Sequence, residues 1–248
     1  MRHALSRASR VPLGEFTRSR LLVAFDYDGT LAPITDDPAN APMRAGTRDL
    51  LAALCQRYPC AVISGRARED VELLVTGVGL RAVAGNHGAE LPGLDAPPES
   101  ADVGRWRATL AVALAGLDGV RIEDKHLSLS VHYRAAKDKD EARRAIGDAA
   151  RSLESVRVVG GKDVVNLVPR GARHKGFALD ELRRGESCEA ALYVGDDETD
   201  EDVFKMRRAL RLLTIRVGEK QDSDAEFYVE TQEEVDALIS ALLELRPA

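Results

Sequence analysis

Two aspartates separated by one residue follow a short apolar run near the start of the chain. Asp26 and Asp28 lie in the segment DYDGTL, directly after the run LLVAF. Gly29 allows the backbone to turn sharply, so both carboxylates can face one pocket. One carboxylate can attack phosphorus and form an aspartyl phosphate, while the other protonates the departing oxygen and later takes a proton from water. The pair predicts covalent phosphoryl chemistry, against the plainer alternative of a turn rich in Asp and Gly.

A second acidic segment, GDDETDED at residues 195–202, follows another apolar run. Its crowded carboxylates repel one another unless a cation or solvent offsets their charge. Hard oxygen ligands of this kind suit Mg²⁺, which keeps several waters and a substrate phosphate in its shell. A solvated acidic helix start is the alternative, because acids favour that end of the helix dipole. Together with the first motif, the segment predicts a magnesium site.

Two further residues complete a predicted anion site. Ser64 follows the run CAVI and can offer a hydroxyl and a backbone N–H to phosphate oxygens. Lys175, in the segment HKG, can supply a cation that neutralises a transferring phosphoryl group. Either residue alone is more often a turn or surface residue, so the prediction depends on their order in the chain with the two acidic motifs.

The elements that must position these residues alternate between strand and helix. Short apolar runs predict buried strands at 21–25, 60–63, 81–84, 190–194 and 212–217. Helical spacing of apolar residues predicts helices at 45–58, 67–75, 201–209 and 233–245. The alternation is typical of a doubly wound, mostly parallel α/β sheet, which binds ligands at the carboxyl ends of its strands. The acidic motifs and Ser64 follow such ends.

The middle of the chain has a different order of elements. A turn-rich linker at 92–98 is followed by a predicted helix at 101–117 and strands at 120–123 and 127–133. A charged helix at 138–154 and strands at 156–159 and 164–168 complete an αββαββ order. We expect a smaller α/β domain at 97–168, inserted into a core formed by 21–96 and 169–248.

Composition narrows the functional classes. With 248 residues, 44% hydrophobic and 31% charged, the chain is typical of a globular protein, and its formal charge of −6 argues against nucleic-acid binding. No run approaches the roughly 20 apolar residues that span a bilayer. We expect residues 1–20, rich in arginine, to form a flexible leader, and the three cysteines to be free thiols in the cytoplasm. For the oligomeric state we favour a monomer.

The four motifs in this order resemble the haloacid dehalogenase superfamily of phosphatases. Within it, the chain is similar to the trehalose-6-phosphate phosphatase family over roughly residues 20–240. The likeness is carried by DYDGTLAP, SGR, GNHGAE, EDKHLSLSVHYR, Gly161-Lys162 and GDDETDED. It implies an α/β core with an inserted cap, Mg²⁺ as cofactor, and a sugar phosphate as substrate, most specifically trehalose 6-phosphate.

The resemblance also implies residue roles. Asp26 is expected to be the nucleophile and a metal ligand, and Asp28 the general acid and base with its carbonyl on the metal. Asp196 is expected to bind the metal directly, with Asp197 and Asp200 in support. Phosphoryl oxygens are assigned to Thr30, Ser64 and Lys175. The residues expected to bind the sugar are Gly65, Arg66, Asn86, His87 and Glu90 of the core, and Glu123, Lys125, Arg134, Lys162 and Asn166 of the cap.

One residue departs from the family pattern. Asn166 stands where the family usually carries glutamate after Gly161-Lys162. A carboxylate only accepts hydrogen bonds from sugar hydroxyls, whereas an amide both donates and accepts. A related disaccharide or pseudo-disaccharide phosphate is therefore an alternative substrate. Two further hypotheses are a phosphosugar mutase and a catalytically silent binding module on the same fold, and the intact pair of Asp26 and Asp28 argues against the silent module.

Overall fold

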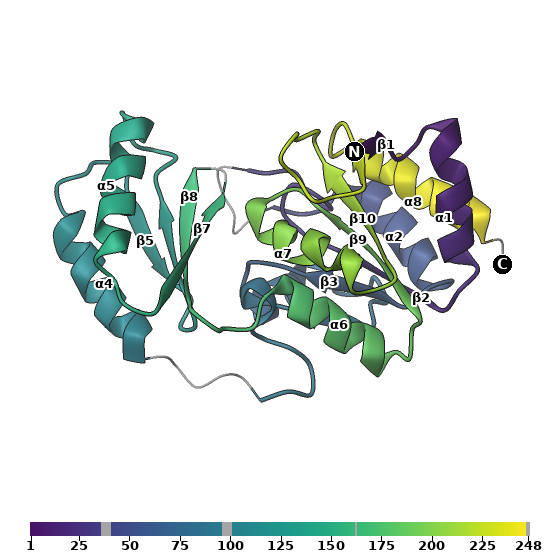
Figure 1. Cartoon of the computed structure of the whole chain (residues 1–248), viewed down its shortest axis with the longest axis horizontal. Coiled ribbons are helices and arrows are strands. Elements are labelled where there is room, and N and C mark those ends of the chain that lie inside the picture. Colours follow the sequence, from purple (N-terminus) through teal and green to yellow (C-terminus); the bar gives the residue numbers. More distant parts are fainter. Residues whose placement is uncertain (36–40, 96–100, 162, 247–248) are drawn as a thin grey trace. The chain divides into compact units, whose positions relative to one another are not determined.

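The chain folds into two compact units. The computed structural model describes residues 1–35, 41–95, 101–161 and 163–246. One unit, the core, is formed by Met1–Leu94 and His174–Ala248, and the other, the cap, by Asp95–Arg173 (Figure 1). The cap extends slightly beyond the expected segment 97–168 at both ends.

The core contains a seven-stranded sheet in which every pair of neighbours is parallel. In spatial order the strands are β1 (Arg2–His3), β11 (Phe227–Val229), β10 (Leu212–Val217), β9 (Ala190–Gly195), β2 (Leu21–Phe25), β3 (Cys60–Ile63) and β4 (Ala82–Ala84). All residues of β2, β3, β9 and β10 are buried, as expected for strands covered on both faces. The predicted fold class is confirmed.

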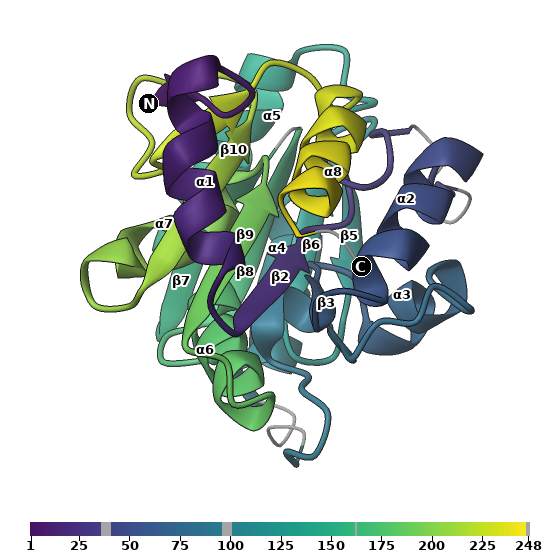
Figure 2. The ribbon, with the colours of Figure 1, turned by 90° about the vertical axis from the view of Figure 1, so that its right-hand side faces the viewer.

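Helices cover both faces of this sheet. Leu21, Val23 and Phe25 point to one face and pack with α1 (Arg10–Thr17), α2 (Ala45–Cys55), α3 (Arg68–Leu74) and α8 (Glu234–Leu245). Figure 2 shows α1 and α8 in front of the strands. Leu22 and Ala24 point to the other face and pack with α6 (Lys175–Gly185) and α7 (Glu201–Phe204). No helix in the described part of the chain is long and apolar enough to cross a membrane.

Short 3-10 turns complete the core unit. They are η1 (Arg7–Ser9), η3 (Asn86–Gly88), η4 (Glu198–Asp200) and η5 (Lys205–Arg208). The single helix expected at 201–209 is therefore α7 followed by η5. Strand β11 and helix α6 were not predicted from the sequence.

The expectation of a flexible basic leader at residues 1–20 is wrong. β1 pairs in parallel with β11, so the first residues are the edge of the core sheet. Leu13 and Thr17 of α1 are buried. The arginine side chains of this segment point outward from the folded core. Two of them form ion pairs there, Arg2 with Glu226 and Arg10 with Glu244. The many arginines made the segment look fully solvated, so the buried positions between them were not recognised from the sequence.

The cap is a four-stranded antiparallel sheet with two helices on one face. Its strand order is β5 (Arg121–Asp124), β6 (Leu129–His132), β8 (Val164–Pro169) and β7 (Val156–Gly161). Helices α4 (Ala101–Ala113) and α5 (Lys139–Arg151) pack on the face that carries Leu129, Val131 and Leu167. The order α4-β5-β6-α5-β7-β8 is the predicted αββαββ order. In Figure 1 the two helices lie together on one side of the four strands.

Candidate functional site

The two acidic motifs follow neighbouring strands of the core sheet. Phe25 of β2 pairs in register with Val194 of β9, and Asp26 N donates to Val194 O at 2.8 Å. Asp26 and Asp196 thus leave the sheet at the same edge, 170 positions apart in the chain. Side-chain oxygens of Asp26, Asp196 and Asp200 lie within 4.8 Å of one another. The structure brings both predicted acidic motifs into one cluster.

Glycine allows this close approach. Gly29 has a φ of +80°, and a Cβ at this position would collide with the carboxylate of Asp196. A Cβ at Gly195 would collide with the carboxylate of Asp200 in the same way. Both glycines therefore leave room for carboxylates that reach across the edge of the sheet.

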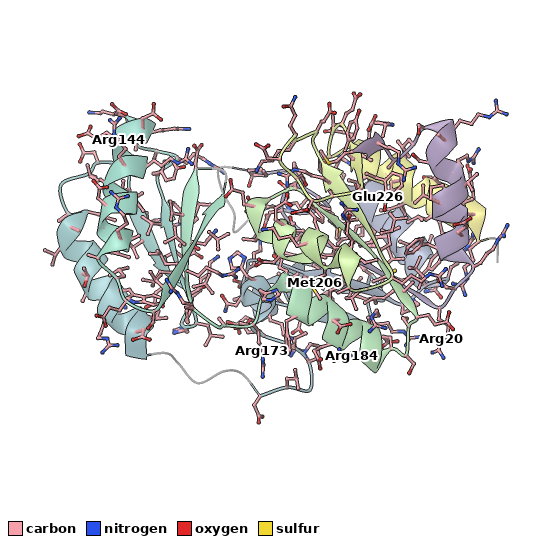
Figure 3. All side chains as sticks on the ribbon, in the orientation of Figure 1. Arg20, Arg144, Arg173, Arg184, Met206 and Glu226 are labelled. Carbon is pink, nitrogen blue, oxygen red and sulfur yellow. The ribbon has the colours of Figure 1, made fainter. Side chains whose placement is uncertain are left out.

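Lys175 lies between two of the carboxylates. Its Nζ is 3.0 Å from Asp26 Oδ1 and 2.7 Å from Asp200 Oδ1, and all three side chains are buried. Burial opposes the charge of Lys175, but Asp200 and Asp26 outweigh it and raise the lysine pKa. The residue after it, Gly176, allows the start of α6 to lie close to α7 and η5, because a Cβ there would collide with Met206, which is labelled in Figure 3.

One cation does not balance three clustered carboxylates, of which Asp26 and Asp200 are buried and Asp196 is half-buried. Burial raises the pKa of Asp26 well above its usual value, and the neighbouring Asp200 and Asp196 add to the shift while Lys175 opposes it. Burial, followed by Asp200 and Asp197, raises the pKa of Asp196 to about 7. A site with this excess of negative charge takes up either a proton or a cation.

Further predicted core residues follow β2 and its neighbour β3. Arg66 Nε lies 2.7 Å from Asp28 Oδ2 and Arg66 Nη2 lies 2.6 Å from Asp28 Oδ1, which is a bidentate ion pair. Ser64 follows β3, is fully buried, and accepts a hydrogen bond from Arg66 N. The Thr30 hydroxyl is buried and has no hydrogen-bond partner among the described residues. Thr30 therefore keeps a free donor that can bind an anion.

Asp197 organises the acidic loop. Its side chain accepts from Glu198 N at 2.7 Å, and its own N–H donates to Asp200 Oδ2 at 2.9 Å. The Asp197 side chain also accepts from the backbone N–H of Asp200, and this bond and the one from Asp197 N form a reciprocal capping box that starts η4. Burial and then Asp200 raise the pKa of Asp197. Asp197 and the second oxygen of Asp200 thus hold the loop together.

The segment GNHGAE lies against the SGR segment. A Cβ at Gly65 would collide with the His87 ring, so the two loops are in direct contact. Glu90 accepts hydrogen bonds from Asn86 Nδ2 at 2.8 Å and from Arg68 N at 2.7 Å. Both oxygens of Glu90 are therefore bonded to the core itself, which favours a structural role over the expected approach to a sugar.

Four of the five predicted cap residues are described. Glu123 of β5 and Asn166 of β8 lie on one row of the sheet, with Ser130 of β6 between them. Ser130 Oγ donates to Asn166 Oδ1 at 2.7 Å, and both side chains are buried. Lys125 and Arg134 flank β6 at its two ends. Lys162 lies outside the described residues.

Glu123 is held by a histidine on the next strand. Glu123 Oε2 is 2.6 Å from His132 Nε2. This hydrogen bond lowers the pKa of Glu123 to about 2, against the opposing effect of burial. The helix-free face of the cap sheet therefore carries a carboxylate that is ionised at neutral pH, next to the neutral pair of Ser130 and Asn166.

Sequence reasoning missed two polar residues that touch the cluster. Tyr193 of β9 is buried and donates to Asp200 Oδ1 at 2.6 Å. Arg216 of β10 is also buried and donates to the backbone carbonyls of the acidic loop. Each interrupts a mainly apolar strand, AALYV or LLTIRV, and that interruption is the signal that could have identified them.

Comparisons with known proteins show which family the chain belongs to. The family model described as trehalose-phosphatase matches residues 24–234. A trehalose-phosphate phosphatase of Mycolicibacterium paratuberculosis is 35% identical over 218 residues, which are 82% of this chain and 56% of that protein. A probable trehalose-phosphate phosphatase of Oryza sativa subsp. japonica is 31% identical over 250 residues, covering 92% of this chain and 67% of that protein. The chain thus spans about half the length of the mycobacterial relative.

A solved structure shares the fold. The C-terminal domain of the trehalose-6-phosphate phosphatase of C. albicans superposes with a TM-score of 0.80 at 23% identity, covering 99% of this chain and 98% of that domain. At this identity the likeness concerns the fold, including both units.

Proposed function

This chain belongs to the trehalose-phosphatase family, and we propose that it is a magnesium-dependent phosphatase that forms a phospho-aspartate on Asp26 and releases trehalose from trehalose 6-phosphate. The observation that carries the proposal is the buried contact of Asp26 with Lys175 beside Asp196, at the carboxyl edge of β2 and β9. A nucleophilic carboxylate, a fixed cation and an acidic metal site are the parts that phosphoryl transfer requires.

The residues present fit a magnesium ion. Asp196 Oδ1 is buried without a hydrogen-bond partner in the described part of the chain, so a ligand atom is left for a cation. Asp200, in contrast, has one oxygen bonded to Lys175 and Tyr193 and the other to Asp197 N. Asp26, Asp196 and the Asp28 carbonyl would therefore hold the ion, with Asp197 and Asp200 supporting the loop. When bound, Mg²⁺ offsets the charge of the phosphoryl oxygens.

The chain's own residues account for the two half-reactions. Asp26 attacks phosphorus, the bond from phosphorus to the sugar oxygen breaks, and Asp28 in its protonated form gives its proton to that oxygen. The ion pair with Arg66 holds the ionised form of Asp28, which the second half-reaction uses. Water then attacks the aspartyl phosphate, Asp28 takes a proton from the water, and inorganic phosphate leaves with Asp26 restored. Lys175 fixes the orientation of Asp26, while the hydroxyls of Thr30 and Ser64 donate to phosphoryl oxygens.

The substrate is proposed from the family and from the polar face of the cap. The residues proposed to bind the sugar come from both units. They are Glu123, Lys125, Arg134, Lys162 and Asn166 of the cap, and Gly65, Arg66, Asn86 and His87 of the core. Disaccharide hydroxyls need several donors and acceptors, and this set supplies both. Binding energy from the sugar then orients the phosphate for attack.

The test is a phosphate-release assay with Mg²⁺ and a panel of mono- and disaccharide phosphates. We expect trehalose 6-phosphate to have the highest kcat/KM, and Asp26→Asn to lose more than about 10³-fold in kcat. Asp180→Asn is the matched control and should keep its activity. Asp180 is also a carboxylate of the core, but within the described residues its ion pairs are with Arg183 and Arg184 of its own helix α6. Activity retained in Asp26→Asn contradicts the mechanism.

Product analysis separates the competing hypotheses. Release of free phosphate indicates hydrolysis, whereas an isomerised sugar phosphate indicates a mutase. Equal rates with all sugar phosphates contradict the proposed substrate but not the phosphatase chemistry. A sharp gain in trehalose 6-phosphate turnover in Asn166→Glu favours a related disaccharide phosphate as the natural substrate.

A further inference from the structure

Arg216 contacts the backbone of the two residues that begin the acidic loop. It lies on β10 opposite Gly195 of β9, and 8% of its surface is exposed. Its Nη2 donates to the carbonyl oxygen of Asp196, and its Nη1 donates to the carbonyl oxygen of Asp197 at 3.2 Å. A planar guanidinium can bind two carbonyls in fixed directions, which a single ammonium cannot.

A glutamate holds the guanidinium from the other side. Arg216 Nη1 lies 3.2 Å from Glu201 Oε1, and the two side chains are only 9% and 12% exposed. Glu201 Oε2 in turn accepts from Asp224 N at 2.9 Å. Arg216 therefore ties the start of the acidic loop to the first residue of α7 and, through Glu201, to the loop before β11.

The Asp196 side chain needs such external support. Its Oδ1 has no hydrogen-bond partner among the described residues, although the atom is buried. Hydrogen bonding therefore does not hold that oxygen in place, and its direction depends on the backbone of residues 196 and 197. Arg216 binds both carbonyls of this backbone, and Gly29 leaves the space into which the carboxylate projects.

We propose that Arg216 is a positioning residue for the cation: it fixes the backbone at Asp196 and Asp197 so that the Asp196 carboxylate is presented ready to bind Mg²⁺. This inference rests on the proposed function, because it assigns a role at the same metal site. Arg216 acts through Asp196 and touches neither substrate nor the attacking oxygen. Its removal therefore weakens cation binding without removing the nucleophile.

The experiment is calorimetric titration of the substrate-free protein with Mg²⁺. Arg216→Lys keeps the charge but loses the bidentate contact, and Arg216→Met loses both. Lys220→Met is the matched control, because Lys220 is a partly exposed cation beside the same loop, with its Nζ 3.8 Å from Glu198 Oε1. We expect both Arg216 variants to bind Mg²⁺ at least about 10-fold more weakly, and Lys220→Met to change the Kd by less than about 2-fold.

A second readout separates positioning from general destabilisation. In Arg216→Lys the Mg²⁺ concentration for half-maximal activity should rise with the Kd, while kcat at saturating Mg²⁺ stays within about 3-fold of the parent. If Arg216→Met does not fold, Arg216→Lys and Glu201→Gln carry the test. Unchanged Mg²⁺ affinity in Arg216→Lys overturns the inference. A parent protein that binds no Mg²⁺ overturns the proposed metal site, and this inference with it.

Discussion

Arg66 holds Asp28 through two hydrogen bonds, from Nε to Oδ2 at 2.7 Å and from Nη2 to Oδ1 at 2.6 Å. Two parallel bonds fix the plane of the carboxylate as well as its position. The Arg66 guanidinium also lies over the ring of Tyr27, 5.5 Å from its centre. Arg66 is expected to bind the sugar, and the same guanidinium is bonded to the proposed general acid.

The first prediction concerns proton donation by Asp28. Arg66→Ala should lower kcat for trehalose 6-phosphate by about 10- to 100-fold, because Asp28 loses its fixed orientation. Hydrolysis of p-nitrophenyl phosphate should fall much less, because its leaving group departs without a proton. Asp28→Ala should show the same dependence on leaving group. Equal losses with both substrates would instead assign Arg66 to phosphate binding.

The second prediction concerns Tyr193. Tyr193→Phe removes only the hydroxyl that donates to Asp200 Oδ1, and it should lower the free energy of unfolding by about 2 kcal/mol. It should lower kcat by no more than about tenfold, because Lys175 still bonds to the same oxygen. Urea denaturation and steady-state kinetics measure the two effects.

Tyr58→Phe is the control for Tyr193→Phe. Tyr58 is buried and donates to the carbonyl of Leu242 at 3.2 Å, away from the acidic cluster. Its loss should cost about 1 kcal/mol of stability with no change in kcat. If the two variants behave alike in both assays, Tyr193 contributes to stability alone.

The acidic edge of the core could be predicted from the sequence because its signal is local. A buried strand appears in the sequence as an unbroken apolar run. Because open α/β sheets bind ligands at the carboxyl ends of their strands, the polar residue that follows such a run is a candidate ligand-binding residue. Phe25 and Val194 end such runs, and their parallel pairing brings Asp26 and Asp196 together. The cap order was predicted for the same reason, because alternating helix and strand periods are visible within a few residues.

The side-chain partners could not be predicted, because they depend on tertiary distances. Arg66 lies 38 positions from Asp28, and Arg216 lies 20 positions from Asp196. A guanidinium in a sequence does not indicate whether it meets a ligand, a carboxylate or a backbone carbonyl. Dependence on distant partners also explains why residues 1–20 were wrongly predicted to be a flexible leader. The strand that pairs with β1 is β11, which lies more than 200 residues away in the chain.

The third prediction concerns removal of the metal. Since burial and neighbouring acids raise the pKa of Asp196 to about 7, the folded metal-free protein binds more protons than the unfolded chain between about pH 4 and pH 7. For this group, the free energy of unfolding therefore falls as the pH rises through that window. Mg²⁺ competes with the proton, so its stabilising effect should be larger near pH 8 than near pH 6.

Thermal denaturation with Mg²⁺ or a chelator measures this difference. The increase in Mg²⁺ stabilisation should not exceed about 1.4 kcal/mol per pH unit for one carboxylate. Asp196→Asn should lose the response to Mg²⁺, and its remaining pH dependence should come from Asp26 and Asp197, whose pKa values burial also raises. A stabilisation by Mg²⁺ that is independent of pH would mean that Asp196 is already ionised in the metal-free protein.

The fourth prediction concerns Asn166 and the choice of substrate. Because Asn166 Oδ1 accepts from Ser130, the amide is oriented and its Nδ2 remains the donor available for a ligand. Asn166→Ala should raise KM for trehalose 6-phosphate by about 10-fold, since a sugar hydroxyl loses its partner, and should leave kcat/KM for p-nitrophenyl phosphate unchanged. Ser130→Ala should give a smaller rise, because the amide is kept but not oriented. Equal losses with both substrates would show that the pair only stabilises the cap sheet, and an unchanged KM would exclude Asn166 from sugar binding.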